Sequence, residues 1–402
     1  MIIVAINECF DGSTGNIARF LLNEASKKGH TCYFAFRSGN CHEDNCIKIY
    51  ENPFLALCSK IESKIDGSDG FHSKKATQSF IKKLSSIKPD IVHIHNLHGS
   101  YINLPILLSY LKRNNIKVVW TFHDCWPFTG RCAHFDFCGC QKWKTYCHDC
   151  SFKNMYPKSF FLDKSKKYYS IKKRMINALN DIVIVSPSFW MDNLLTESFL
   201  GNKKHLCIYN GIDPLASSFD RLETKRINAY VCTNKYKKIV FSAAYPFSKK
   251  KGIDYILKLA NDSRLQNVLF LIAGLSGKQN NNLPANVLSL GIIKDRAKMN
   301  SYYRLADVFL NPTLEEVFGL VNVESMLNGT PVITFNSGGS PEIITEKTGT
   351  VIERGDYEGL VNAIIFSKKT SEIENQCVKR ALLFTDERMS KEYIKVYESF
   401  EK

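Results

Sequence analysis

The sequence predicts an α/β protein made of two Rossmann-like, doubly wound domains that face each other across a cleft. Short apolar runs recur along the chain, and segments of helical periodicity separate most of them, which is the pattern of β-α-β repetition. The runs are apolar throughout instead of alternating with polar residues, as expected of parallel strands covered on both faces. The pattern ends near the middle of the 402 residues and then restarts. Two domains are therefore more economical than one large sheet.

The first domain is predicted over residues 1–209. It opens with an apolar strand at residues 2–7, a polar loop at residues 8–16 and a helix at about residues 17–28 that ends at Gly29. Its other strands are predicted at residues 31–36, 91–95, 117–123, 182–186 and 205–209. Because helices lie between most of these strands, the connections should be the right-handed crossovers of a parallel sheet.

The second domain is predicted over residues 210–386, and residues 210–214 (Asn-Gly-Ile-Asp-Pro) are predicted to be the linker that leads into it. Its strands are predicted at residues 238–243, 268–273, 287–290, 308–311 and 331–335. A last helix within residues 387–402 can pack against either domain, so it is a candidate to cross back to the first. Ligands of open α/β sheets bind beyond the carboxyl ends of the strands, which makes the loops there the first candidates for a site.

The composition excludes several classes of protein. Hydrophobic residues make up 44% and charged residues 23%, which is the balance of a globular rather than a disordered chain. No run approaches the roughly 18 apolar residues of a membrane span, and the opening run lacks both a basic segment and a cleavage site of small residues. We therefore expect neither an integral membrane protein nor a Sec-secreted one. The 14 cysteines are accordingly interpreted as reduced thiols or metal ligands.

The net charge of +15 comes from 54 lysines and arginines against 39 aspartates and glutamates, and most of the excess lies in the first half. A basic half predicts a polyanionic partner, which can be anionic lipid, a diphosphate or a nucleic acid. A nucleic-acid binder would need its basic residues along one face, and no nucleic-acid motif occurs in the sequence. We therefore expect no nucleic acid among the partners.

Two glutamates follow the predicted strand at residues 308–311. Glu316 lies in the loop after the strand, and Glu324 lies in the second turn of the next helix. The amino end of a helix favours phosphate and sugar oxygens, and Gly319 allows the backbone to approach a ligand closely. Carboxylates accept hydrogen bonds from sugar hydroxyls. The alternative is that Glu315 and Glu316 form a solvated cluster that the helix dipole favours.

These glutamates belong to motifs that resemble the signature of retaining glycosyltransferase family 4, whose members have the GT-B fold. The resemblance covers nearly the whole chain. In the second half the motifs are Glu316-x7-Glu324, Phe318-Gly319-Leu320, Gly338-Gly339-Ser340-Pro341-Glu342, Lys251-Gly252, Ala273-Gly274 and Gly291. In the first half, Trp120-Thr121-Phe122-His123-Asp124 and the cysteine-containing residues 129–150 resemble a bacterial subgroup that includes the colanic-acid and surface-polysaccharide biosynthesis glycosyltransferases.

The resemblance implies that residues 1–209 form the acceptor-side domain, with a Cys-rich insertion at about residues 125–150, and that residues 210–386 bind the nucleotide-sugar donor. It implies that Glu324 holds the ribose, Glu316 faces the donor sugar and Lys251 neutralises the leaving diphosphate. The catalytic candidates are Glu316, His123 and Lys251. The donor-binding candidates are Gly15, Lys251, Gly274, Glu316, Phe318, Gly319, Leu320 and Glu324. No cofactor is expected to be required for catalysis.

One position departs from the family pattern. Many members have an arginine soon after the first strand of the second domain, where this chain has Ser242-Ala243-Ala244-Tyr245-Pro246. Lys249 and Lys250 are candidates to replace it, and both also fit ordinary surface charges.

Four histidines lie near predicted strand ends in the first half. His93, His95 and His98 lack a carboxylate at ligand spacing other than Asp90, so a structural or acceptor-side role is favoured over a metal site. His123 is followed by Asp124, which could orient it for acid–base chemistry. The alternative is a hydrogen-bonded histidine that transfers no proton.

Six of the 14 cysteines fall within residues 125–150. Cys147 and Cys150 have the spacing of half a zinc knuckle, and Cys132 and Cys140 can supply the other half. Because the segment is expected to lack a hydrophobic core of its own, a closed structural zinc site at these four is predicted. The family resemblance selects the same four and leaves Cys125 and Cys138 as extras. Two disulfides and free thiols are the alternatives, with His134 and His148 as substitute ligands.

A basic segment follows the cysteines, with Tyr168, Tyr169 and Ile171 interleaved. Its basic residues are Lys164, Lys166, Lys167, Lys172, Lys173 and Arg174. On a helix they would form a basic face beside an aromatic one, which predicts contact with the anionic surface of the inner membrane. The alternative is a solvated run of charges.

The sequence therefore predicts a retaining, hexosyltransferase-type glycosyltransferase. We expect it to move a sugar from a nucleotide-diphosphate sugar to a lipid-linked oligosaccharide in the biosynthesis of a surface polysaccharide such as O-antigen of lipopolysaccharide, capsule or a colanic-acid-like polymer. The expected location is cytoplasmic, peripherally associated with the inner face of the cell membrane. A non-catalytic nucleotide-sugar-binding regulatory protein and another GT-B enzyme, such as a sugar-nucleotide epimerase, are the alternatives. The presence of Glu316 and Lys251 favours transfer.

Overall fold

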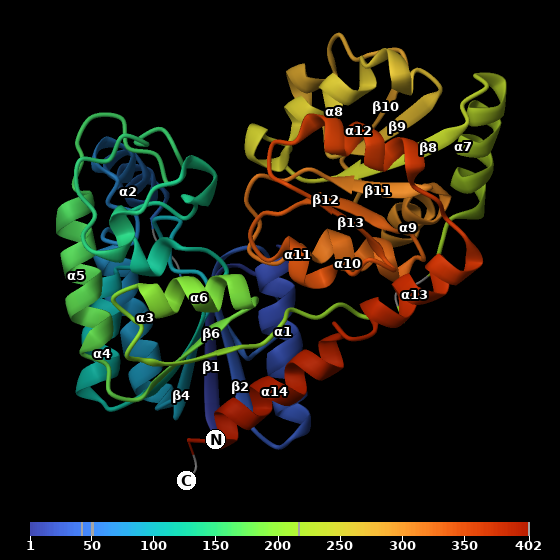
Figure 1. The fold of residues 1–402 in the computed structure, drawn as a ribbon. Coiled ribbons are helices and arrows are strands. Elements are labelled where there is room, and N and C mark those ends of the chain that lie inside the picture. The colour runs from blue at the N-terminus through green and yellow to red at the C-terminus, as the bar shows by residue number, and fades with distance from the viewer. Residues whose placement is uncertain (42, 50–51, 216–217, 401–402) are drawn as a thin grey trace. The chain divides into compact units, whose positions relative to one another are not determined.

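The computed structural model describes residues 1–41, 43–49, 52–215 and 218–400. The chain divides into two compact units, which are Met1–Tyr209 with the chain from Met389 onward, and Asn210–Arg388. Each unit is a parallel sheet with helices packed on it, so the predicted α/β class with two Rossmann-like domains is confirmed (Figure 1).

Unit 1 contains a seven-stranded sheet in the order β3-β2-β1-β4-β5-β6-β7, and all its strand pairs are parallel. The strands are β1 (Ile2–Cys9), β2 (Thr31–Ser38), β3 (Cys46–Lys48), β4 (Ile91–Ile94), β5 (Lys117–Thr121), β6 (Ile182–Ser186) and β7 (Lys204–Cys207). The helices are α1 (Gly12–Lys27), α2 (Pro53–Asp66), α3 (Lys74–Ile87), α4 (Leu104–Arg113), α5 (Ser165–Asn177), α6 (Phe189–Glu197) and most of α14 (Asp386–Glu398). The central strands β4 and β6 are buried at every residue, which explains their continuous apolar runs.

Unit 2 contains a six-stranded sheet in the order β10-β9-β8-β11-β12-β13. The strands are β8 (Lys238–Ala243), β9 (Val268–Ala273), β10 (Val287–Gly291), β11 (Val308–Asn311), β12 (Val332–Phe335) and β13 (Gly349–Ile352). The helices are α7 (Arg221–Thr233), α8 (Ile253–Ala260), α9 (Arg296–Leu305), α10 (Leu320–Leu327), α11 (Ser340–Ile343), α12 (Tyr357–Phe366) and α13 (Ser371–Ala381). The strand order reverses between β8 and β11, so the loops after these two strands lie at the usual ligand position of such sheets.

The start of the chain differs from the prediction. Helix α1 begins at Gly12, so the loop predicted at residues 8–16 is much shorter and Gly15 lies in the first helical turn. Gly12 has a φ of +85°, which glycine adopts easily. A Cβ atom on Gly15 would lie 2.3 Å from the carbonyl oxygen of Phe10, so this tight return from β1 requires glycine. The apolar periodicity that locates most helices is absent from this glycine-containing turn.

Two buried tyrosines of helix α14 form hydrogen bonds with residues of the sheet of unit 1. The hydroxyl of Tyr397 bonds with Nδ1 of His93 at 2.7 Å, and the hydroxyl of Tyr393 bonds with Oγ1 of Thr121 at 2.8 Å. Both tyrosine side chains are fully buried. The end of the chain is therefore part of the core of unit 1.

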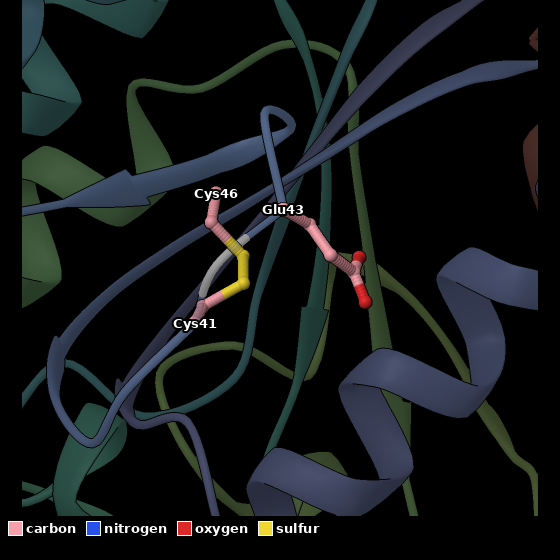
Figure 2. A group of neighbouring side chains, drawn as sticks. All are labelled: Cys41, Glu43 and Cys46. Carbon is pink, nitrogen blue, oxygen red and sulfur yellow. A yellow bond between two sulfur atoms is a disulfide. The ribbon is translucent and has the colours of Figure 1, made fainter.

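Cys41 and Cys46 form a disulfide, contrary to the expectation that the cysteines are reduced thiols or metal ligands (Figure 2). A carboxylate oxygen of Glu43 lies within 4.8 Å of both sulfurs. Because the sulfurs are bonded to each other, they are not thiolate ligands. Within the described residues, no helix has the length and apolar character to cross a membrane.

Candidate functional site

The loop between β11 and α10 carries Glu316, and the turn after β12 holds it in place. The carbonyl oxygen of Glu316 accepts a hydrogen bond from the amide of Gly339 at 2.8 Å. A Cβ atom on Gly338 would lie 1.8 Å from the same oxygen, so only glycine allows this approach. Gly319, with a φ of +95°, leads directly into α10. Gly319 thus shapes the turn at the amino end of this helix, which is an end that favours oxygen ligands.

Lys251 lies on a neighbouring loop and meets Glu316. It closes a short helical turn (Lys249–Lys251), and the hydroxyl of Ser248 accepts its amide hydrogen. Gly252 packs so tightly on Pro312 that a Cβ atom would lie 2.0 Å from the proline carbonyl oxygen. The loops after β8 and β11 therefore pack closely against each other. Within this arrangement Nζ of Lys251 forms an ion pair with Oε2 of Glu316, and both side chains are mostly buried.

This pair combines a cation with an oxygen acceptor at the carboxyl end of the sheet. The ammonium group can stabilise charge on a phosphate, and the carboxylate can accept hydrogen bonds from sugar hydroxyls. The alternative of a solvated Glu315–Glu316 cluster is wrong, because Glu315 is 1% exposed and Glu316 is paired.

Glu324 lies in the second turn of α10. The hydroxyl of Tyr303 donates a hydrogen bond to Oε2 of Glu324 at 3.0 Å, and Nη1 of Arg296 lies 3.4 Å from Oε1. Burial raises the pKa of Glu324, while Arg296 and Tyr303 oppose that shift. The side chain keeps 21% of its surface exposed, so it remains reachable by a hydroxyl ligand. Sequence reasoning missed Arg296 and Tyr303, because no motif links them to Glu324.

The glycine predicted at the end of β9 is required by close packing. Gly274 has a φ of +104°, and a Cβ atom there would lie 1.8 Å from the carbonyl oxygen of Ala244. Its amide donates to the carbonyl oxygen of Gly291 at 2.7 Å. Three loops after β8, β9 and β10 therefore meet here.

Three other candidates have distinct surroundings. Phe318 is buried against Phe384, with ring centroids 5.7 Å apart, so its side chain is not available to a ligand. Leu320 is the first, half-buried residue of α10. The ammonium group of Lys249 is exposed and lies 3.9 Å from Asp254, outside the Lys251–Glu316 pair.

His93, His95 and His123 form a row of neighbouring rings in unit 1, in which His93 and His95 are buried. His93 is fully satisfied, because Nδ1 bonds with Tyr397 and Nε2 bonds with Oγ1 of Thr121 at 2.9 Å. His95 bonds through Nδ1 with Nε2 of His123 at 3.0 Å. Burial lowers the pKa of His93 to about 3 and that of His123 to about 4. All three rings therefore stay neutral at pH 7, although His123 is only half-buried.

Asp124 does not orient His123 as expected. Its Oδ2 bonds with Nε2 of His98 at 2.6 Å, and its Oδ1 accepts the amide hydrogen of Trp126 at 2.9 Å. Burial opposes the charged forms of both partners, but their mutual attraction lowers the pKa of Asp124 to about 2 and raises the pKa of His98. The hydroxyl of Tyr156 bonds with Nδ1 of His98 at 2.8 Å. Asp124 is thus paired with His98 and not with His123.

The structure brings the four predicted zinc ligands to one small cavity. Cys132, Cys140, Cys147 and Cys150 all line it. None of the four is in a disulfide, so the alternative of two disulfides is wrong.

The basic segment does not form the predicted surface. Tyr168 and Tyr169 are buried in unit 1, so the aromatic face of α5 points into the protein. Lys172 is also buried, and burial lowers its pKa to about 7. Lys164 is paired with Asp66 at 2.7 Å. The basic residues of the segment that remain exposed are Lys166, Lys167, Lys173 and Arg174.

Comparisons with known proteins agree with this fold and these loops. Residues 15–214 match the family described as Glycosyltransferase Family 4, and residues 224–383 match the family described as Glycosyl transferases group 1. The fold, the loops described above and the two family matches together identify the chain as a glycosyltransferase. The chain belongs to the GT-B glycosyltransferases of the family 4 type.

Individual relatives cover most of the chain. It is 23% identical to the putative colanic acid biosynthesis glycosyl transferase WcaC of Escherichia coli K12, over 97% of both chains. It is 24% identical to the O-antigen biosynthesis glycosyltransferase WclY of Escherichia coli, over 80% of this chain and 84% of WclY.

Solved structures share the fold. A sucrose-phosphate synthase from Thermosynechococcus elongatus gives a TM-score of 0.72 at 16% identity, over 99% of this chain and 98% of that chain. HepE of Anabaena in complex with UDP-glucose gives a TM-score of 0.68 at 14% identity, over 99% of this chain and 100% of that chain.

Proposed function

We propose that this chain is a retaining glycosyltransferase that moves a sugar from a nucleotide-diphosphate sugar to a lipid-linked oligosaccharide during the biosynthesis of a surface polysaccharide. The observation that carries the proposal is the Lys251–Glu316 ion pair, held on two interlocked loops next to the start of α10. Such a pair suits a reaction in which a diphosphate leaves from a sugar carbon. A protein that only bound a nucleotide would have no need of it.

Each of the three donor candidates has a different proposed role. Lys251 would stabilise the negative charge that develops on the leaving diphosphate, and Glu316 would accept hydroxyls of the donor sugar. Glu324, held by Tyr303 and Arg296, would accept the ribose hydroxyls. The UDP-glucose complex of HepE, which has the same fold, supports a nucleotide-sugar donor. The names of WcaC and WclY support a surface polysaccharide as the product.

Binding of the nucleotide tests the donor site. We expect calorimetry to find micromolar binding of either UDP or GDP, and Glu324→Gln to weaken it at least tenfold, or about 1.4 kcal/mol. Glu346→Gln removes an exposed charge elsewhere in unit 2 and should leave the affinity unchanged. If the folded wild type binds neither nucleotide, the assignment of this site as the donor site is wrong.

The retention of configuration is tested by NMR of the product, and an inverted linkage would contradict it.

A second part of the proposal is that unit 1 rests on an anionic membrane through α2. This helix turns its polar residues Ser59, Ser63 and Asp66 inward. Its exposed apolar residues follow helical spacing and are Phe54, Leu57, Ile61 and Ile65. A helix at the surface of a globular protein normally has the reverse arrangement.

A neighbouring segment extends this apolar surface. Phe160, Phe161 and Leu162 are exposed, and their amides bond with the carbonyl oxygens of Lys64 and Ile65 at the end of α2. We call these three residues, together with the four exposed apolar residues of α2, the α2 patch. Exposed Lys60, Lys64 and Lys158 belong to the same segments. Apolar side chains at the acyl boundary and lysines among anionic headgroups are the features of interfacial helices. The α2 patch therefore replaces the aromatic face of α5 as the proposed contact.

Vesicle flotation tests the α2 patch. We expect the wild type to bind phosphatidylglycerol vesicles better than phosphatidylcholine vesicles. The triple variant Phe54→Gln, Ile61→Gln, Phe161→Gln should bind the anionic vesicles at least tenfold more weakly. The matched control replaces Leu222 and Phe366, exposed apolar residues of unit 2, by glutamine. Unchanged binding of the triple variant, with loss of binding when Lys166, Lys167, Lys173 and Arg174 are reversed in charge, would return the contact to α5.

A further inference from the structure

The long connection between β5 and α5 has two different sides. Its described helical elements are three single turns, which are Trp126–Phe128, Asp136–Cys138 and Lys142–Lys144. One side is an aromatic cluster of Phe128, Phe135 and Trp143, with ring centroids 4.9 to 6.2 Å apart. The prediction that this segment lacks a core of its own is therefore wrong. The other side is the cavity lined by the four cysteines.

Arg131 is buried beside this cavity. Its side chain is 1% exposed, and its guanidinium donates hydrogen bonds to the carbonyl oxygens of Phe152, Lys153, Met155 and Pro157. Nη1 also lies 3.9 Å from Sγ of Cys150. The ion pairs of the described residues give Arg131 no carboxylate within 4.0 Å. Asp163 acts on it only from farther away and accepts the amide hydrogens of Cys150 and Ser165.

A second basic side chain lies nearby without a close carboxylate. Lys172 is fully buried, donates to the carbonyl oxygen of Trp126 at 2.6 Å and lies 4.1 Å from the centroid of the Trp126 ring. Buried cations are stable when an anion compensates them, and carbonyl dipoles and a ring supply only part of that compensation. Four neutral thiols add no charge. Four thiolates around a divalent cation carry a net charge of −2. This charge would balance the two positive charges of Arg131 and Lys172.

Backbone geometry also favours sulfur in the thiolate form at this position. The amide of Gly130 donates a hydrogen bond to Sγ of Cys147 at 3.2 Å. Amide donors to sulfur are typical of the shell around thiolate metal sites. A Cβ atom on Gly130 would lie 2.7 Å from Cβ of Cys147, so glycine is needed for this contact.

We propose that Cys132, Cys140, Cys147 and Cys150 bind one zinc ion in a closed tetrahedral site, with Arg131 as its buried counter-charge. Four sulfur ligands with no open position suit a structural rather than a catalytic zinc. Binding forms four Zn–S bonds and releases the four thiol protons, with no change of oxidation state. Zn–S bonds of about 2.3 Å place the sulfurs about 3.8 Å apart. No three of the four sulfurs lie within 4.8 Å of one another in this structure, so binding draws them closer.

Metal analysis of the full chain, purified without chelators, is the direct test. We expect close to one zinc per chain in the wild type, Cys125→Ser and Cys138→Ser. In Cys132→Ser and Cys150→Ser we expect a small fraction of one. Well under one zinc in the wild type overturns the site, and iron in its place overturns the choice of metal. Equal loss in Cys125→Ser and Cys150→Ser overturns the ligand set.

Two measurements keep the test valid if the cysteine variants fail to fold. The wild type reconstituted with Co²⁺ should show the visible absorption of a tetrahedral tetrathiolate, and a spectrum without thiolate-to-metal charge transfer overturns the proposal. Arg131→Met should weaken zinc binding at least tenfold in competition with a chromogenic chelator, whereas Lys158→Met, which removes an exposed charge from the same connection, should change it little. Equal affinities in these two variants overturn the role of Arg131. The nucleotide-binding test is independent of these results, because Glu324, which it probes, lies in unit 2 and the four cysteines lie in unit 1.

Discussion

Replacing Lys251 by methionine is expected to lower kcat/KM at least 100-fold, measured as the release of nucleoside diphosphate from the donor sugar nucleotide. The ammonium group would act on charge that is fully developed only as the diphosphate leaves, and single groups of this kind contribute about 10²–10³ in rate. The variant also leaves the carboxylate of Glu316 without its partner, close to where the diphosphate is proposed to bind. Nucleoside diphosphate affinity should therefore fall more than nucleoside monophosphate affinity.

Lys249→Met is the matched control for this prediction. Lys249 lies on the same turn and carries the same charge, but 88% of its side chain is exposed. It should keep kcat/KM within about twofold. The double variant Lys251→Met, Glu316→Gln removes the whole ion pair, and recovery of activity in it would mean that the two residues only stabilise each other.

Unit 1 is expected to lose stability steeply between pH 6.5 and pH 5. His93 and His95 are buried, His123 is half-buried, and desolvation lowers the pKa of each below the value of about 6.5 for an unfolded chain. In this window the unfolded chain binds more protons than the folded one, so the free energy of unfolding falls as the pH falls. The loss should be about 2 kcal/mol for each histidine. His98 acts in the opposite direction, because Asp124 raises its folded pKa and its contribution is retained at low pH.

Urea denaturation followed by tryptophan fluorescence measures this loss in unit 1 alone, because all four tryptophans lie in residues 120–190. His123→Gln should remove about a third of the dependence on pH. His205→Gln, which alters the pair with Asp192, is the control. A dependence that is the same in wild type and His123→Gln would show that His123 does not titrate as burial predicts.

The strands illustrate what the sequence predicts well. Central strands such as β4 and β6 are covered on both faces, so they need continuous apolar runs, and such runs are visible in one dimension. Two short strands, β3 and β13, were missed. One residue of β3 and none of β13 is buried, so the apolar signal is weak. The start of α1 was missed because glycines form its first turn through backbone freedom rather than helix propensity.

The candidate donor residues were selected by motif, and their partners in the structure were not predicted. Glu316 and Glu324 stand on one short loop and helix, so their spacing survives in the sequence. The pairing of Lys251 with Glu316 spans 65 residues, and Arg296 reaches Glu324 from the first turn of α9. Such pairs depend on how the loops after separate strands converge, which no local pattern records.

By itself the sequence determined two parallel sheets, the loop that carries Glu316 and the four cysteines that line one cavity. These features follow from local rules, which are apolar runs, glycine positions and ligand spacing. Only the tertiary structure decided which side of α5 and α2 faces inward. Tyr168, Tyr169 and Lys172 turned into the protein, while Phe54 and Ile61 turned out. Amphipathic spacing marks two faces of a helix, but the neighbouring elements decide which of them is buried.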